Sequence, residues 1–208
     1  GTNMPKQKIT KEDVVNAAFE LAKEYGPEYI TVKKISEKLS CSVQPIYTYC
    51  ANMQGLKREV NEKVRAYIKK YVSRRVHGGD IFKETGQAYL KLAKEEPNIY
   101  KMFTSHKREN VSSLEDLYNL EADPQIAEIV SKQLEISLEK AKTLHLNMLI
   151  YSIGIGMIFS RTFPGIPAEE IFAQQEHAFK AFLAQAQNGE VEKEKVAESD
   201  CFGKEKSK

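Results

Sequence analysis

Apolar residues recur at the spacing of an α-helix along most of this chain, and the pattern is clearest near the amino terminus. The stretch TKEDVVNAAFELAKEYG, residues 10–26, places valine, alanine and leucine three or four positions apart, which predicts an amphipathic helix. Thr10 and Asp13 have the spacing of a capping box at the start of this helix. Gly26 is expected to end it in a left-handed C-cap, and Pro27 prevents its continuation.

Three more helices are expected in the next fifty or so positions. Thr31 is expected to be the N-cap of the first of these helices, and Ser42 the N-cap of the short helix that follows it. About three residues separate these two helices, which is the spacing of a helix-turn-helix. Asn52 is expected to cap a longer helix over 52–76, in which apolar residues repeat every four positions.

The rest of the chain also predicts helices and has no strand pattern. Helices are expected over 82–97, 124–141, 142–161 and 167–187, with a short aromatic segment at 98–109 and a loop at 107–123. The apolar run at 148–159 is too short to span a bilayer. We therefore expect an all-α fold, with an amino-terminal three-helix helix-turn-helix domain and a larger carboxy-terminal helical domain.

Charge is distributed unevenly along the chain. Residues 1–76 contain 15 Lys and Arg against 8 Asp and Glu, a net charge of +7. The remaining residues contain 16 against 21, a net charge of −5. A basic first third joined to an acidic remainder indicates a polyanionic partner for the first part only. The alternative is a chance imbalance of solvated charges that serves no partner.

Little in the sequence indicates catalysis or a metal site. The cysteines number three, and no CxxC or Cys–His spacing accompanies them, so neither a disulfide framework nor a zinc site is predicted. We find no paired carboxylates, nucleophile with a base, or phosphate-binding loop. We therefore expect a cytoplasmic protein that is not an enzyme, that has no cofactor and no metal, and that does not enter a membrane.

The decapeptide CSVQPIYTYC, residues 41–50, contains no lysine, arginine or carboxylate, although 29% of the chain is charged. The second helix of a helix-turn-helix enters the major groove, where hydrogen-bonding and apolar side chains read the base edges. Gln44 is expected to bond base edges, its apolar neighbours to contact thymine methyl groups, and flanking hydroxyls to reach phosphates. The residues expected to bind DNA are Thr31, Lys33, Lys34, Ser42, Val43, Gln44, Pro45, Tyr47, Thr48, Tyr49 and Asn52. Alternatively, Tyr47 and Tyr49 are ordinary packing aromatics of a helical bundle.

The stretch ITVKKISEKLSCSVQPIYTYCANMQGL, preceded by a capped helix that ends in glycine, resembles the amino-terminal domain of the TetR family of one-component transcriptional regulators. The order and spacing of IT, ISEKLSC, IYTYC and ANMQGL follow the family pattern over residues 10–60. The chain departs from that pattern at Ser40 in place of glycine, Tyr49 in place of histidine, Cys50 in place of phenylalanine, and Met53 in place of a phosphate-contacting lysine. These departures bear on DNA affinity and sequence preference more than on the fold.

The resemblance implies a homodimer on palindromic, double-stranded operator DNA, released by a small hydrophobic effector. It also implies an effector cavity, whose candidate residues are Tyr89, Tyr100, Met102, Phe103, Tyr118, His145, Met148 and Tyr151. The last two long helices would form the dimer, with candidate interface residues Ser152, Gly156, Ser160, Ala178 and Phe182. The alternative is that both sets are plain core.

The expected organisation is a disordered arm at 1–9, a helix-turn-helix domain at 10–56, a connecting helix at 57–76, an effector-binding and dimerisation domain at 77–188, and a disordered charged tail at 189–208. Two other functions stay open at the level of sequence. One is a regulator that binds DNA constitutively and recruits a protein partner through its second domain. The other is an all-helical enzyme with its pocket in the second domain, which no recognisable catalytic constellation supports.

Overall fold

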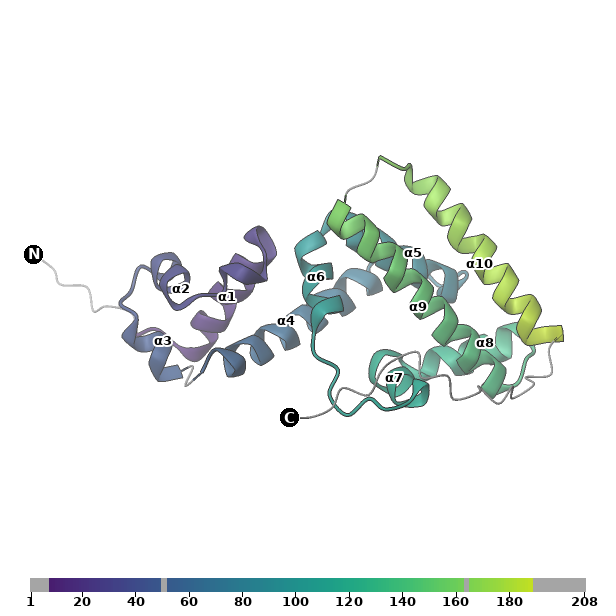
Figure 1. The fold of residues 1–208 in the computed structure, drawn as a ribbon, viewed down its shortest axis with the longest axis horizontal. Helices are drawn as coiled ribbons and strands as arrows, with labels where there is room; N and C mark the ends of the chain where they lie inside the picture. Colours follow the sequence, from purple (N-terminus) through teal and green to yellow (C-terminus); the bar gives the residue numbers. More distant parts are fainter. Residues whose placement is uncertain (1–7, 50–51, 163–164, 189–208) are drawn as a thin grey trace, which may run out of the picture.

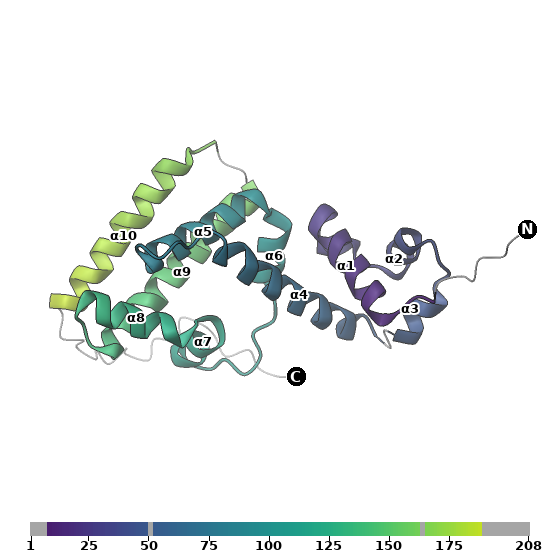
Figure 2. The same cartoon turned by 180° about the vertical axis from the view of Figure 1, so that it is seen from behind.

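The computed structural model describes residues 8–49, 52–162 and 165–188, which form ten α-helices and one short 3₁₀ helix, with no strand in these ranges. The all-α fold expected from the sequence is therefore confirmed. The molecule is elongated, with helices α1 to α3 at one end and α5 to α10 at the other, joined by α4 (Figures 1 and 2). The arm and tail expected to be disordered fall, at 1–7 and 189–208, outside the described residues.

The amino-terminal lobe consists of α1 (Lys11–Tyr25), the 3₁₀ helix η1 (Pro27–Tyr29), α2 (Val32–Leu39), α3 (Gln44–Tyr49) and the start of α4 (Met53–Ser73). The capping box is confirmed, because the Asp13 amide donates to Thr10 Oγ1 and the Thr10 amide donates to the Asp13 carboxylate. Gly26 ends α1 with a positive φ of 109°, as expected. Its ψ of 158° is extended, however, so the expected left-handed helical conformation is wrong.

The turn between α2 and α3 is made by a residue with a side chain. Ser40 has φ 50° and ψ 42°, in the left-handed region that glycine adopts at lower cost. The expectation that Ser42 caps α3 is wrong, because the helix begins at Gln44. The carbonyl of Val43 accepts the first helical amides, those of Ile46 and Tyr47. Thr31 and Asn52 cap α2 and α4 as expected, by accepting from the amides of residues 34 and 55.

The second lobe consists of α5 (Ile81–Glu95), α6 (Pro97–Ser105), α7 (Leu114–Glu121), α8 (Pro124–Leu134), α9 (Leu138–Thr162) and α10 (Ala168–Asn188). The loop expected at 107–123 is wrong, because Ser113 caps α7 within it by accepting from the Asp116 amide. The single helix expected over 124–141 is also wrong. It breaks at Glu135, which has a left-handed φ of 53°, and α9 starts at Leu138 rather than at 142.

Helix α9 is the centre of the second lobe, because α5, α6, α8 and α10 all pack against it. One hydrophobic core runs from α1 through α4 to α5 and α6, so the two lobes share it. A second core lies under α7 and α8 against α9 and α10. Helix α9 is long and apolar enough to cross a membrane, as the core helices of soluble proteins can also be. In its most apolar segment, 33% of the residues are buried. The exposed large apolar side chains of α9 are Leu138, Ile150 and Ile158.

Candidate DNA-binding surface and ligand cavity

Helix α3 lies at the far end of the amino-terminal lobe (Figure 1), and its residues Gln44, Tyr47 and Thr48 are exposed. Ile46 is fully buried and anchors the helix on α1 and α2. Tyr47 is 59% exposed and Val43 44% exposed, and Gln44 is exposed beside them. Leaving large apolar side chains in water costs free energy that burial would recover. Tyr47 is therefore not a packing aromatic of this chain, whereas Tyr49 is partly buried against the core.

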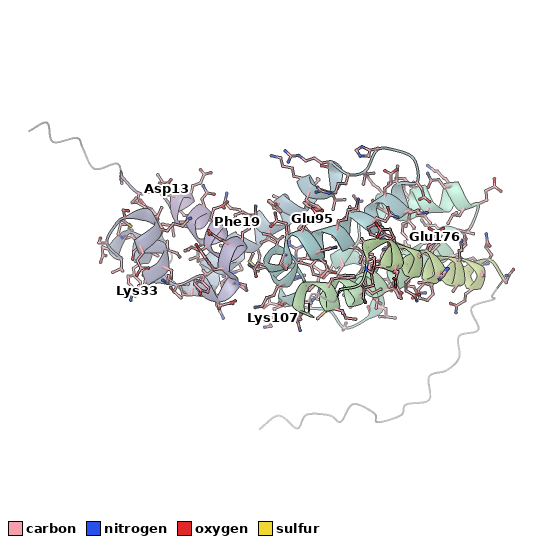
Figure 3. The ribbon with its side chains drawn as sticks, turned by 90° about the horizontal axis from the view of Figure 1, so that it is seen from above. Asp13, Phe19, Lys33, Glu95, Lys107 and Glu176 are labelled. Carbon is pink, nitrogen blue, oxygen red and sulfur yellow. The ribbon has the colours of Figure 1, made fainter. Side chains whose placement is uncertain are left out.

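The polar candidates around α3 have mixed roles. Thr31 and Asn52 use their side chains as N-caps, so their first task is to satisfy backbone amides. Lys33 is exposed at the outer surface of this lobe (Figure 3), and Lys34 is exposed but lies 3.3 Å from the Glu37 carboxylate. Thr48 is exposed, and its hydroxyl donates to the carbonyl oxygen of Gln44. Of these two lysines, Lys33 is the one that forms no ion pair within 4 Å among the described residues.

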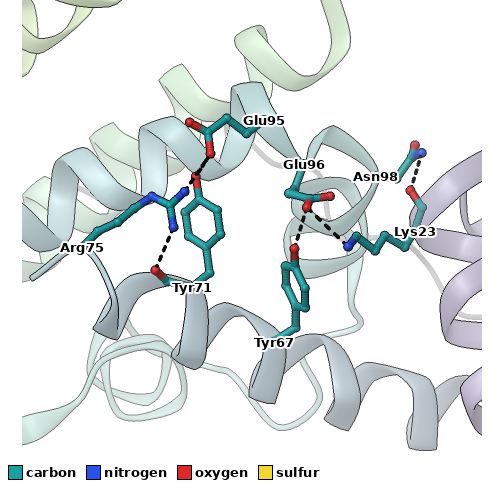
Figure 4. Close-up of polar contacts among 7 residues, drawn as sticks. All are labelled: Lys23, Tyr67, Tyr71, Arg75, Glu95, Glu96 and Asn98. Atoms are coloured by element: carbon teal, nitrogen blue, oxygen red, sulfur yellow. Dashed lines mark hydrogen bonds and ion pairs between the residues drawn. The ribbon is translucent and has the colours of Figure 1, made fainter.

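The corner between α5 and α6 contacts α1 and α4 of the first lobe through a polar cluster (Figure 4). Glu96 accepts a hydrogen bond of 2.5 Å from the Tyr67 hydroxyl of α4 and lies 3.5 Å from Lys23 Nζ of α1. Asn98 Nδ2 donates to the carbonyl oxygens of Lys23 and Glu24, at 3.0 and 3.2 Å. These carbonyls are in the last turn of α1, where helical partners are lacking. Asn98 therefore caps α1 from the other lobe.

A second set of contacts joins the same corner to the end of α4. The Tyr71 hydroxyl donates to Glu95, and Arg75 Nη2 donates to the same carboxylate at 3.0 Å. Burial and the Glu95 carboxylate raise the pKa of Tyr71. The Arg75 guanidinium also lies over the Tyr71 ring, 3.5 Å from its centroid. We call residues 95, 96 and 98 with their partners the α6 clamp.

A largely apolar cavity of about 100 Å³ lies in the second lobe, bounded by α5, α6, α9 and α10. Five of the eight predicted ligand residues line it: Tyr89, Tyr100, Phe103, His145 and Met148. Three do not. Met102 is buried in the core that the lobes share, Tyr151 lies outside the lining, and Tyr118 lies behind His145.

Sequence reasoning found Tyr89 on α5 but missed the other cavity-lining residues of that helix and the whole contribution of α10. The missed aromatic lining residues are Phe82, Phe172 and Phe179, and the missed polar ones include Gln175, Glu121 and Ser152. Gln175 is 6% exposed, and its Nε2 donates to Ser152 Oγ at 3.0 Å. A buried glutamine on an otherwise amphipathic helix is a signal that could have been found, because such a side chain needs a polar partner.

His145 and Tyr118 form a buried polar pair at one wall. The Tyr118 hydroxyl and His145 Nδ1 are 3.0 Å apart, and Phe82 meets the imidazole edge-on at 5.6 Å between ring centroids. Burial lowers the pKa of His145 to about 4, although the Asp123 carboxylate acts in the opposite direction. The imidazole is therefore neutral near pH 7. Among the described residues, no group of three or more His, Cys, Asp or Glu could hold a metal ion.

Tyr100 connects the cavity to α6. Its ring is fully buried, it lines the cavity, and its hydroxyl donates to the carbonyl oxygens of Ser152 and Ile153, both at 3.3 Å. The hydroxyl lies so close to Gly156 that a Cβ there would be 2.1 Å from it. Glycine at 156 is thus what allows the tyrosine of α6 to reach the backbone of α9.

The predicted dimer stripe needs correction. Ser152, Gly156 and Ser160 are all buried; Ser152 Oγ accepts from Gln175 of α10 and Gly156 lies against Tyr100 of α6, so this stripe faces the inside of the protomer. Two positions along a helix rotate a side chain by about 200°, and the exposed face is accordingly the opposite one. There Ile150 is 47% and Ile158 55% exposed. A Cβ added at Gly154, which lies between them, would have no other described atom within 4 Å. The other two candidates, Ala178 and Phe182, are partly buried on α10, and Phe182 packs against the second core.

Comparison with known proteins identifies the fold. No protein-family model and no curated protein matches the chain. The crystal structure of BioQ with its double-stranded DNA operator is 13% identical and covers 85% of this chain and 99% of its own, with a TM-score of 0.55. A TetR variant from Acinetobacter baumannii AYE in complex with minocycline is 15% identical over 86% of this chain and 97% of its own, with a TM-score of 0.56. A transcriptional regulator from Rhodococcus sp. Rha1 is 15% identical over 86% and 96%, with a TM-score of 0.52. The TetR-type fold expected from residues 10–60 is therefore confirmed.

Proposed function

We propose that this chain, which has the TetR-type fold, is a transcriptional regulator that binds palindromic operator DNA as a homodimer and is released by a small apolar effector. The observation that carries the proposal is α3, a short exposed helix free of charge on the lobe that carries the excess of cations. The structural likeness to BioQ, which was crystallised with its operator, supports the same reading. The protein acts by binding, without a catalytic step.

The exposed side chains of α3 suit the major groove. Gln44 can donate to and accept from base edges, and the apolar surfaces of Val43 and Tyr47 can contact thymine methyl groups. Lys33 in the first turn of α2, together with the amides of that turn, would contact phosphates and set the orientation of α3. The lysine that the family pattern places at Met53 is missing, so fewer phosphate contacts are expected from the start of α4.

The homodimer would form through the exposed face of α9. A four-helix arrangement of α9 and α10 from two protomers would cover Ile150 and Ile158, and Gly154 would allow close approach. A two-fold dimer presents its two α3 helices to half-sites one or more DNA turns apart, roughly 34–36 Å or a multiple of it. The palindromic operator follows from this symmetry.

Release would proceed through α6. Tyr100 and Phe103 line the cavity, and the clamp residues lie at the start of the same helix, Glu96 as its N-cap and Asn98 in its first turn. A ligand that displaces the two rings would shift α6, and with it the contacts to α1 and α4. Such a shift alters DNA affinity only if the ligand binds the two positions of α6 with different affinity.

The proposal is tested by selecting a duplex from a random library with the full-length protein and measuring its affinity against salt. Each neutralised phosphate should add about 0.9 to the slope of log K against log salt. Lys33→Ala should lower that slope by about 1 and weaken all sequences alike, whereas Gln44→Ala should mainly relax sequence preference. Lys107→Ala is the matched control, because Lys107 is an exposed lysine on the other lobe (Figure 3). A slope near zero for the wild type would contradict DNA binding.

A further inference from the structure

The cavity offers an incoming ligand one hydrogen-bond donor whose position is fixed. His145 is 9% exposed and lines the cavity, and its Nδ1 faces the Tyr118 hydroxyl. Tyr118 is 5% exposed, and its hydroxyl has no other hydrogen-bond partner in the described part of the chain. If the phenol accepted from Nδ1–H, its own proton would be buried without an acceptor. The phenol therefore donates to Nδ1, and the neutral imidazole carries its proton on Nε2.

His145 Nε2 keeps some accessible surface, and the side chain to which it belongs lines the cavity. This nitrogen has no hydrogen-bond partner among the described residues. It is nevertheless not fully enclosed, unlike His106 Nε2, which also lacks a partner. An Nε2–H at a cavity wall needs an acceptor, from water or from a ligand. Because much of the wall is aromatic or aliphatic, Nε2–H is one of the few donors there, together with the Tyr89 hydroxyl, that can meet a ligand's acceptor.

The charges around His145 are already compensated. Lys83 Nζ lies 2.6 Å from Glu176 Oε2, and Arg108 Nε lies 2.7 Å from Glu121 Oε1. The remaining acids facing this region are Asp80, which caps α5, and Asp123, which caps α8. No unpaired cation of the described chain lines the cavity to hold an anionic ligand. The carboxylates Glu121 and Glu176 are already held by cations, so the site has no need of a cationic ligand either.

The size of the cavity limits the ligand further. At about 100 Å³ it is smaller than the apolar cavity of roughly 150 Å³ that takes up benzene in an engineered protein. A single ring already exceeds this volume, so it is the largest group that suits the cavity, and the ring and any substituent extend through the cavity's open side. The flat walls of Phe82, Tyr89 and Phe103 suit such a ring.

We propose that the cavity binds an uncharged, single-ring aromatic compound whose carbonyl or hydroxyl oxygen accepts the hydrogen bond of His145 Nε2. Tyr118 is a positioning residue, since it fixes the imidazole tautomer without touching the ligand. This inference rests on the proposed function only in taking the cavity as the effector site.

Three probes of nearly equal shape test it by calorimetry on the full-length protein. Acetophenone has the acceptor, α-methylstyrene replaces the carbonyl oxygen with a methylene, and benzoate adds a negative charge. Acetophenone should bind about 10-fold more tightly than α-methylstyrene, the effect of one buried hydrogen bond. Benzoate should bind more weakly than both, and acetophenone binding should take up no proton between pH 6 and 8.

Variants distinguish loss of the donor from loss of folding. For each variant the affinity for acetophenone is divided by the affinity for α-methylstyrene, so a general loss of binding cancels. His145→Leu should bind both neutral probes equally, and His145→Gln, which keeps an amide donor near the Nε2 position, should restore part of the preference. Tyr118→Phe should reduce the preference while leaving α-methylstyrene affinity unchanged. His177→Leu, at an exposed histidine of α10 outside the cavity, should match the wild type.

Equal affinity of the wild type for acetophenone and α-methylstyrene would overturn the proposal, as would failure of every probe to bind at millimolar concentration. Tighter binding of benzoate with proton uptake would overturn it in favour of an anionic ligand. DNA affinity is measured separately without any probe, so loss of the ligand preference is distinguishable from failure of the regulator function.

Discussion

Glycine-to-alanine substitution at two positions of α9 tests which face of this helix packs inside the protomer. A Cβ at Gly156 would lie 2.1 Å from Tyr100 Oη and 2.4 Å from its Cζ, whereas a Cβ at Gly154 has no described atom within 4 Å. The Tyr100 ring is fully buried and cannot swing into solvent. The two variants carry the same chemical change on the same helix, so their difference isolates the contact with Tyr100.

The expected magnitudes have opposite signs. Replacing a helical glycine with alanine stabilises by about 1 kcal/mol through backbone entropy, and Gly154→Ala should gain most of this within the single protomer. At Gly156 the hydroxyl would have to retreat by about 1.3 Å to reach the ordinary contact distance of 3.4 Å. Overpacking of this kind costs roughly 1–3 kcal/mol, so Gly156→Ala should be destabilising by up to about 2 kcal/mol after the helix gain.

The assay is urea unfolding followed by circular dichroism at one protein concentration, because dimer formation makes stability depend on concentration. Sedimentation velocity on each variant shows whether Gly154→Ala alters association. In a Tyr100→Leu background the cost of Gly156→Ala should fall, giving a coupling energy between the two positions. A Gly156→Ala variant as stable as Gly154→Ala would refute the placement of Tyr100 against Gly156.

Three further outcomes are expected. Ser40→Gly should raise the free energy of unfolding by about 0.5 kcal/mol in urea titrations, because glycine adopts φ 50° without the cost that serine bears; a decrease would contradict the turn geometry. The pKa of His145 is lowered to about 4 in the folded protein, so the unfolded chain takes up the proton first as pH falls. The stability of the wild type relative to His145→Gln should therefore fall by roughly 3 kcal/mol from pH 7.5 to pH 4, and an equal pH profile for both would contradict the burial of a neutral imidazole. Asn98→Ala should lose two hydrogen bonds to the end of α1 and about 1–2 kcal/mol of stability. Asn98→Asp should lose more, because it sets a carboxylate against two carbonyl oxygens. Equal stability of the two variants in urea would count against the capping contact.

Local signals explain what could be predicted from the sequence. Thr10, Thr31 and Asn52 cap helices with amides three residues away, and such contacts depend on a few neighbouring positions only. The apolar repeat of α4 identified its buried face for the same reason. Helix α7 was missed although Ser113 and Asp116 carry the same capping pattern, because a run of polar residues precedes it.

The face of α9 could not be predicted, because this helix is apolar all round. Small residues occur both at Ser152 and Gly156 and, two positions on, at Gly154, so the pattern alone does not distinguish the inner stripe from the outer one. The pairing of Tyr118 with His145 and the contribution of Gln175 to the cavity depend on contacts between residues more than twenty positions apart. Such contacts follow from the packing of helices, which periodicity within one helix does not encode.

The link from the cavity through α6 to the DNA-binding lobe is tested most directly by one comparison. The affinity of the wild-type protein for its selected duplex is measured at one salt concentration, with and without a compound that raises the melting temperature by binding the cavity. The expected result is a change of about 5–150-fold, which Asn98→Asp should reduce. A compound that occupies the cavity and stabilises the protein, yet leaves DNA affinity unchanged, would contradict the coupling and favour a regulator that binds DNA constitutively.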